Sequence, residues 1–446
     1  MPDHATDLTR RGLLAAAGAA GAAAAIGPAA ATAAAPPAAL PRRRSAAAAR
    51  RARAPWPAWP ARTRRGEPLT FVDLAAVDQN AKVIQSFARR QGWAVRPALK
   101  AFQSPQLCAY VLRQLPQPRG LVFHLRQVDE IMTAAPAGTD LLMGYPPTRG
   151  ELRAYLGSRP PRGQRRHRLT ILASSVELLE DLERLARTTR RPLPLDVALE
   201  FDSGLGRGGL HFEPDIAAAI KVLRRAKRRL RLRAVLCYDG HATLTGDLGV
   251  RQTVAKQARE FYANYLAQLT ADGSDLYDAR TLIRNGPASA NYRNWAGSRE
   301  CNEISPGSAY MYAGYLQTFD KEGLARAVTQ CAPVLKDVGP YPTELVSKKP
   351  LPPITGEEYF LVGSSWPDGD GNQPEFIYPA GVQDNLREGG RAAVYAPKGS
   401  LSTEDYVLMW PHQSGDGIDF FGAVHAVRNG KLLDVWPTFT RWGTRR

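Results

Sequence analysis

Four groups of polar residues in this sequence follow short apolar runs and could carry out chemistry together. They are Lys100, Asp202 with Arg207, Tyr238 with His241, and the segment 285–289. A lysine that ends a strand and faces a pocket rather than solvent loses part of its hydration, which lowers its pKa and exposes a nucleophilic amine suited to Schiff-base chemistry. A lone lysine in a loop is more commonly a surface residue. Catalysis therefore requires that the fold brings these groups to one place.

The elements that would position these groups are predicted from the pattern of apolar residues. From residue 93 onward, short apolar or β-branched runs alternate with segments of helical periodicity. The expected strands are 93–99, 120–125, 140–144, 168–173, 195–201, 232–237, 281–284 and 308–312. The expected helices are 105–114, 127–135, 149–156, 176–188, 214–229 and 250–269. Eight such units over about 220 residues favour an α/β protein with a closed (β/α)8 barrel of the TIM type, in which strand ends meet at one face.

The pattern changes after about residue 335, where short aromatic-rich runs are separated by proline and glycine. The expected strands there are 359–363, 375–378, 392–395, 405–410, 422–428 and 431–436. The tetrapeptide 428–431, which reads RNGK, is typical of a hairpin turn, and no long helical period occurs. We therefore expect a barrel over 67–330 and a mostly antiparallel β domain over 331–446. The run 69–74, which precedes the barrel, could join the β domain.

The net charge of +17 is concentrated at the amino terminus. The first 65 residues contain eleven arginines and two acidic residues, so they carry +9 of the total. An arginine pair, Arg10 and Arg11, precedes an Ala/Gly-rich run, as in a twin-arginine export signal. We predict a signal over 1–35, a basic linker over 36–66, and a periplasmic or secreted mature protein without stable membrane insertion.

The remaining basic residues do not indicate a nucleic-acid partner. The basic segment 221–229 falls on an expected helix with apolar residues at core spacing, and no aromatic residues interleave with its charges. The segment 204–209, GLGRGG, matches G-x-G-x-x-G, but it follows the fifth strand and holds an arginine where a pyrophosphate requires small side chains. We expect its glycines to turn the chain and aim Arg207 into the barrel mouth. The segment 285–289 is equally compatible with a phosphate-binding loop and with a plain tight turn.

Longer motifs around these residues resemble a known family. The segment 95–104 reads VRPALKAFQS, 200–209 reads EFDSGLGRGG, 238–241 reads YDGH, and 302–308 reads NEISPGS. They are similar to the R-P-H-x-K-T-H-K-S, E-x-D-x-G-x-x-R-x-G, Y-x-G-H and T-E-L-R-P-G-S segments of the D-threonine aldolase and D-serine dehydratase-like family, in the same order. That family has an alanine-racemase-type barrel of the fold type III pyridoxal 5′-phosphate enzymes.

The resemblance implies a role for each matching residue. Lys100 would hold pyridoxal 5′-phosphate as a Schiff base, and Arg207 would face the pyridine nitrogen and keep it largely unprotonated. The loop from Gly286 to Ser289 would bind the phosphate. His241 would act as an acid or base near the β-carbon of the substrate, and Tyr238 could pack on the cofactor or orient His241. The implied protein is a homodimeric lyase acting on a β-hydroxy D-amino acid, of the aldolase or dehydratase kind.

The sequence also departs from that family. Phe102 and Gln103 replace a histidine and a second lysine, and the H-x-C or H-x-D motif of metal-dependent members becomes His412-Gln413-Ser414. Serine is a poor ligand for a divalent metal, and Asp416 could substitute only if the loop shifts by two residues. Whether His412 and Asp416 bind a metal therefore stays open.

Two other functions stay open as well. A racemase or epimerase would need two bases on opposite faces of the substrate, Lys100 and His241 or a tyrosine, and no metal. A non-catalytic periplasmic binding module could retain the same barrel without turnover.

Overall fold

A computed structural model describes residues 66–159, 167–211, 213–243, 247–318, 323–340, 356–362, 374–384, 393–403 and 405–439. The expected export signal 1–35 lies outside these residues, as does the expected linker 36–66 except for its last residue. In the described part of the chain, no helix is both long enough and apolar enough to cross a membrane.

Eight parallel strands form the predicted barrel. They are β2 (Ala94–Val95), β3 (Arg119–Val122), β4 (Asp140–Met143), β5 (Arg168–Ala173), β6 (Leu195–Phe201), β7 (Leu230–Cys237), β8 (Ile283–Ala288) and β9 (Glu303–Ser305). Their order in the sheet is β2-β9-β8-β7-β6-β5-β4-β3. A parallel bridge between Ala98 and Leu121 brings the two ends of this order together. The Leu121 amide donates to the Pro97 carbonyl at 2.8 Å, so the barrel is nearly closed.

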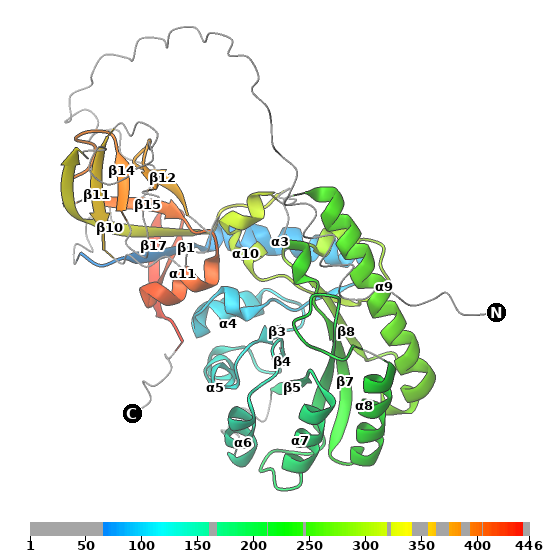
Figure 1. Cartoon of the computed structure of the whole chain (residues 1–446). Coiled ribbons are helices and arrows are strands. Elements are labelled where there is room, and N and C mark those ends of the chain that lie inside the picture. The colour runs from blue at the N-terminus through cyan, green and yellow to red at the C-terminus, as the bar shows by residue number, and fades with distance from the viewer. Residues whose placement is uncertain are drawn as a thin grey trace, which may run out of the picture. The chain divides into compact units, whose positions relative to one another are not determined.

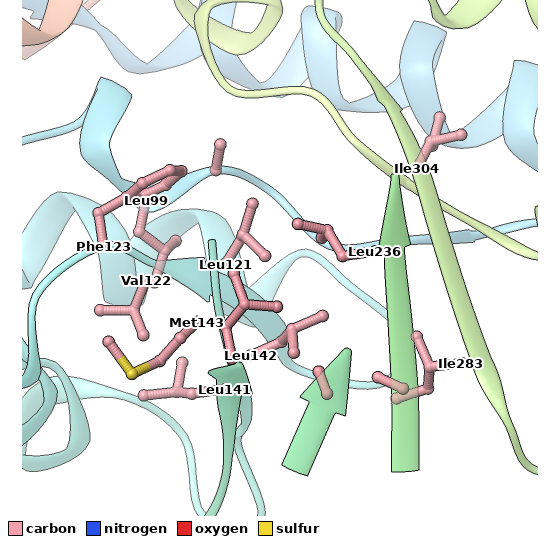
Figure 2. Packing of buried hydrophobic residues seen from close by; sticks show 14 of the residues in the cluster. Leu99, Leu121, Val122, Phe123, Leu141, Leu142, Met143, Leu236, Ile283 and Ile304 are labelled. Carbon is pink, nitrogen blue, oxygen red and sulfur yellow. The ribbon is translucent and has the colours of Figure 1, made fainter. Parts of the chain in front are cut away.

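Helices follow most of these strands and cover the outside of the barrel (Figure 1). They are α4 (Pro105–Arg113), α5 (Leu125–Ala134), α6 (Arg149–Gly157), α7 (Val176–Ala186), α8 (Glu213–Ala226) and α9 (Leu248–Gly273). Helix α7 shows why such helices form here: Ser175 caps its first turn, and Leu179 and Leu182 recur at helical spacing on its buried face. Figure 2 shows apolar side chains of neighbouring strands, such as Leu121 of β3 and Leu142 of β4, packed together.

The predicted eighth strand over 308–312 is wrong. The eighth strand of the barrel is Glu303–Ser305, and Ser308–Met311 form the short helix α10. This strand contains the charged residue Glu303, so its sequence lacks the apolar pattern by which strands were predicted. The Glu303 side chain is nevertheless buried against Arg96. The helix α3 (Leu74–Gln91) was not predicted either; it begins at the cap residue Asp73 and ends at Gly92.

A buried ion network fills the part of the barrel around the start of β4. Arg96 is fully buried and contacts Glu303 at 2.6 Å and Asp140 at 3.2 Å. Arg233 from β7 contacts the same Asp140 carboxylate at 2.7 Å. Burial alone would raise the pKa of Asp140, but Arg233 and Arg96 outweigh it and lower the pKa to about 2. The network therefore joins β2, β4, β7 and β9 across the barrel.

A second, mostly antiparallel sheet confirms the predicted β domain. It contains β1 (Leu69–Asp73), β10 (Val328–Pro340), β11 (Glu357–Leu361), β12 (Glu375–Tyr378), β13 (Gln383–Asp384), β14 (Ala393–Ala396), β15 (Tyr406–Trp410), β16 (Ala423–Arg428) and β17 (Lys431–Pro437). As expected, β1 joins this sheet, antiparallel to β10 and parallel to β16. The domain also contains a helix, α11 (Ser414–Phe421), which was not predicted from the sequence. The helix has only eight residues, two of them glycine, and is too short to show a helical period.

Candidate active site

The predicted site residues follow the carboxyl ends of neighbouring parallel strands. Lys100 lies in the single turn η1 (Leu99–Ala101) after β2, and Arg207 lies in the loop after β6. Tyr238 comes directly after β7, His241 lies in the turn η3 (Gly240–Thr243), and Ser289 comes directly after β8. The carboxyl ends of the strands in such a barrel form one face, which is where active sites of this architecture lie.

Two aromatic rings define the surroundings of Lys100. Its Nζ atom lies 4.9 Å from the centroid of the Phe123 ring and 5.6 Å from that of Tyr145. These two rings meet edge to face at 5.0 Å and follow β3 and β4. Lys100 itself is exposed. Contact with aromatic faces, which attract a cation, positions the amine instead of burial.

The loop after β6 is built to present Arg207. The Asp202 carboxylate accepts hydrogen bonds from the amides of Gly204 at 3.1 Å and Gly206 at 3.2 Å. Gly209 has a φ of +108°, and a Cβ there would lie 2.8 Å from the Asp202 amide nitrogen. Only glycine fits such a position, because it combines a positive φ with close approach of two backbones. The glycines therefore shape the loop, as the sequence predicted.

Arg207 connects the lysine site to β6 and β7. Its Nη2 atom donates to Glu200 Oε1 at 2.8 Å. Its Cζ atom lies 4.4 Å from the centroid of the Tyr238 ring and 5.1 Å from that of Tyr145. Because Tyr145 also contacts the Lys100 amine, its ring links the two cations. We call Lys100, Tyr145, Arg207 and Tyr238 the cation–aromatic array.

Tyr238 and His241 are both partly buried, and this shifts their proton affinities. Burial raises the pKa of Tyr238, so its hydroxyl stays protonated at neutral pH. Burial also lowers the pKa of His241, against a smaller opposite effect of Asp202. The imidazole is therefore neutral at pH 7 and can accept a proton. Its buried Nδ1 atom has no hydrogen-bond partner among the described residues.

Three hydroxyl groups gather beyond the end of β8. Ser289 Oγ accepts from the amides of Gly307 at 2.8 Å and Ala309 at 3.1 Å. The Tyr315 side chain, from the turn η6 (Gly314–Thr318), makes hydrogen bonds to Ser308 and Ser289. Hydroxyl groups of this kind could bind a phosphate. Tyr315 was not among the site residues predicted from the sequence, and Ser308 was recognised there only as the end of a motif.

The expected loop over 285–289 is wrong for its first four residues. β8 extends through Ala288, and Gly286 is buried within it. The reason is Asn285, whose amide group donates to Glu303 at 2.9 Å and Ser305 at 2.8 Å and so ties β8 to β9. A polar residue that satisfies its hydrogen bonds inside a barrel has the same appearance in the sequence as a loop residue.

The β domain contributes a segment to this region. The amide of Tyr315 donates to the His412 carbonyl at 3.1 Å, and the two rings lie 5.9 Å apart. A Cβ on Gly415 would lie 2.5 Å from the Lys100 carbonyl oxygen, so α11 begins directly against η1. Burial lowers the pKa of His412. The segment 412–415 therefore contacts both the turn that holds Lys100 and the hydroxyl cluster.

The predicted metal ligands are only partly described. His412 is half-buried, and Ser414 is fully buried with no hydrogen-bond partner for its Oγ among the described residues. The side chain of Asp416 lies outside the described part of the structure. Within that part, no three His, Cys, Asp or Glu side chains are grouped so that they could hold a metal ion. The described residues therefore do not test whether His412 and Asp416 bind a metal.

The family model of the alanine racemase N-terminal domain matches residues 72–314. Among solved structures, D-threonine aldolase from Filomicrobium marinum is 17% identical, with a TM-score of 0.69, and the match covers 83% of this chain and 96% of that one. D-threo-3-hydroxyaspartate dehydratase from Delftia sp. HT23 is 16% identical, with a TM-score of 0.67 and coverage of 84% and 98%. Alanine racemase from Bacillus anthracis is 13% identical, with a TM-score of 0.57 and coverage of 83% and 97%. No curated protein sequence matches the chain.

Proposed function

The chain belongs to the alanine racemase N-terminal domain family, the barrel of the fold type III pyridoxal-phosphate enzymes, and from this we propose that it is a lyase acting on β-hydroxy D-amino acids. The observation that carries the proposal is the cation–aromatic array, which places an amine and a guanidinium around one tyrosine ring. The similarity to an aldolase and a dehydratase, both named for D-amino acids, supports the choice of a lyase.

The residues present fit pyridoxal 5′-phosphate. Lys100 offers the amine that would bind its aldehyde, and Arg207 offers a cation for its ring nitrogen. The hydroxyl cluster of Ser289, Ser308 and Tyr315 offers donors for its phosphate. The bound cofactor would supply an electron sink for negative charge that develops on the α-carbon of the substrate.

The chain's own groups would then move the protons. In a dehydratase, the Lys100 amine removes the proton from the α-carbon, and hydroxide leaves the β-carbon. In an aldolase, the neutral imidazole of His241 accepts the proton of the β-hydroxyl while the bond between the α- and β-carbons breaks. The protonated hydroxyl of Tyr238 can donate a hydrogen bond but cannot serve as the base at neutral pH.

The products formed from D-threonine test this proposal. Glycine with acetaldehyde identifies the aldolase, and 2-oxobutanoate with ammonia identifies the dehydratase. Inversion at the α-carbon alone identifies a racemase, which is the second candidate because the chain also matches alanine racemase in structure and holds two proton acceptors, Lys100 and His241. No turnover and no uptake of cofactor would refute both enzymes and favour a binding module.

We propose that the protein is exported and acts as a homodimer. The arginine pair at Arg10 and Arg11 supports export by the twin-arginine route. A reporter protein fused behind residues 1–35 should reach the periplasm, and replacing both arginines by lysine should retain it in the cytoplasm. Light scattering of the purified mature protein tests the dimer.

A further inference from the structure

Glu200 is a buried carboxylate at the end of β6 that forms an ion pair with one arginine, Arg207. Its side chain is 6% exposed, and its Oε1 atom accepts a hydrogen bond from Arg207 Nη2 at 2.8 Å. The same guanidinium lies against the rings of Tyr145 and Tyr238. Among the described residues, no other acceptor takes a hydrogen bond from the Arg207 guanidinium. One carboxylate and two rings therefore determine where its remaining N–H groups point.

This ion pair differs from the structural ion pairs elsewhere in the barrel. Burial raises the pKa of Glu200, and Arg207 offsets only part of that effect. Glu183 on α7 is 5% exposed, but Arg229 and Arg187 outweigh the effect of its burial and lower its pKa. A carboxylate whose burial is not compensated reduces stability at neutral pH, and such groups occur preferentially at functional sites. Arg207 therefore compensates the burial of Glu200 less fully than Arg229 and Arg187 compensate that of Glu183.

We propose that Glu200 is a positioning residue. It holds the Arg207 guanidinium between Tyr145 and Tyr238, so that the free N–H groups face the ring nitrogen of a bound pyridoxal phosphate. The inference rests on the proposed function, because it needs a cofactor in the site. Glu200 acts through Arg207 and does not itself touch the cofactor.

The test combines two variants and a control in the full mature protein. Glu200→Gln keeps the size of the side chain and removes its charge, which should weaken binding of pyridoxal 5′-phosphate about tenfold by weakening one charge-assisted hydrogen bond. Glu183→Gln, in the structural pair, should leave cofactor binding unchanged. In an Arg207→Met background, Glu200→Gln should have no further effect on binding, because its action passes through Arg207.

A spectroscopic signal separates positioning from a general structural effect. With ring-labelled nitrogen-15 cofactor, the wild-type protein should show an unprotonated nitrogen that accepts a hydrogen bond, and Glu200→Gln should shift the signal toward that of the free unprotonated cofactor. Thermal unfolding at pH 7 should show that Glu200→Gln is as stable as the wild type. If Glu200→Gln does not fold, Glu200→Asp, which keeps the charge but withdraws it by one methylene, should still shift the nitrogen signal.

Three results would overturn parts of this reasoning in distinguishable ways. If the wild type binds cofactor and Glu200→Gln binds it equally well with the same nitrogen signal, the inference fails and the proposed function stands. If Glu200→Gln weakens binding equally in the Arg207→Met background, Glu200 does not act through Arg207. If the wild type takes up no cofactor, the proposed function fails, and the inference fails with it.

Discussion

Replacing Asp140 by asparagine should destabilise the protein by about 2 kcal/mol at pH 7. The Asp140 carboxylate accepts hydrogen bonds from both Nη atoms of Arg233, at 2.8 and 2.7 Å, and from Arg96 at 3.2 Å. Asparagine keeps the shape of the side chain but loses the charge that compensates these two arginines. Because Arg96 is fully buried, loss of the Asp140 charge leaves a cation in the barrel interior with less compensation.

The magnitude follows from the pKa of the carboxyl group. Its pKa falls from 3.8 to about 2 on folding, and each tenfold change in proton affinity corresponds to about 1.4 kcal/mol. Because the pKa of Asp140 is lower in the folded state, the stabilisation is fully present above pH 3.8 and is lost as the pH falls toward 2. The difference between wild type and Asp140→Asn should therefore shrink as the pH falls below 3.8.

Urea unfolding at a series of pH values from 7 to 3 measures this difference. Asp275→Asn is a matched control, because Asp275 pairs with Arg224 at 2.7 Å at the surface, where both side chains are at least half exposed. An exposed pair contributes little, so the control should unfold nearly as the wild type does. A difference for Asp140→Asn that is near zero at pH 7, or that does not decrease in acid, would show that the Asp140 carboxylate does not stabilise the fold through these arginines.

Three further predictions concern the site. Gly209→Ala should weaken cofactor binding more than Gly208→Ala, because both positions have a positive φ but only a Cβ at 209 meets backbone atoms; equal affinities in a cofactor titration would contradict this. Activity should fall in acid as His241 becomes protonated below its lowered pKa, and the pH profile of kcat/KM for His241→Gln should lack that acid limb. EDTA should leave product formation unchanged, because Ser414 stands where a stronger metal ligand would be needed; a loss of activity that Mn²⁺ restores would instead show that the reaction needs a metal.

The sequence predicted the barrel well because most of its strands contain a short run of consecutive apolar residues, such as 141–143 in β4 and 234–237 in β7. The prediction failed where polar residues satisfy one another inside the barrel, as Glu303 does with Arg96 and Asn285 does with Ser305. No local pattern reports such pairs, because each joins segments far apart in the chain. The short helix α11 was missed for a different reason, since eight residues give too little periodicity.

The candidate site was predicted where residues lie at strand ends or in long motifs. Lys100 and Arg207 do come together around Tyr145, and Tyr238 packs against Arg207, as the barrel architecture requires. Tyr315 could not be found in this way, because it reaches the end of β8 only through a turn after α10. The burial of Glu200 against Arg207 likewise depends on the fold of the loop, not on the spacing of the two residues.

The most direct test of the proposed chemistry is borohydride reduction of the purified mature protein with pyridoxal 5′-phosphate, followed by peptide mapping. The cation–aromatic array predicts one reduced adduct, on Lys100, and an absorbance band of the bound cofactor that disappears in Lys100→Ala. An adduct on another lysine, or none, in a protein that otherwise folds normally would contradict the assignment of Lys100 and with it the proposed enzyme.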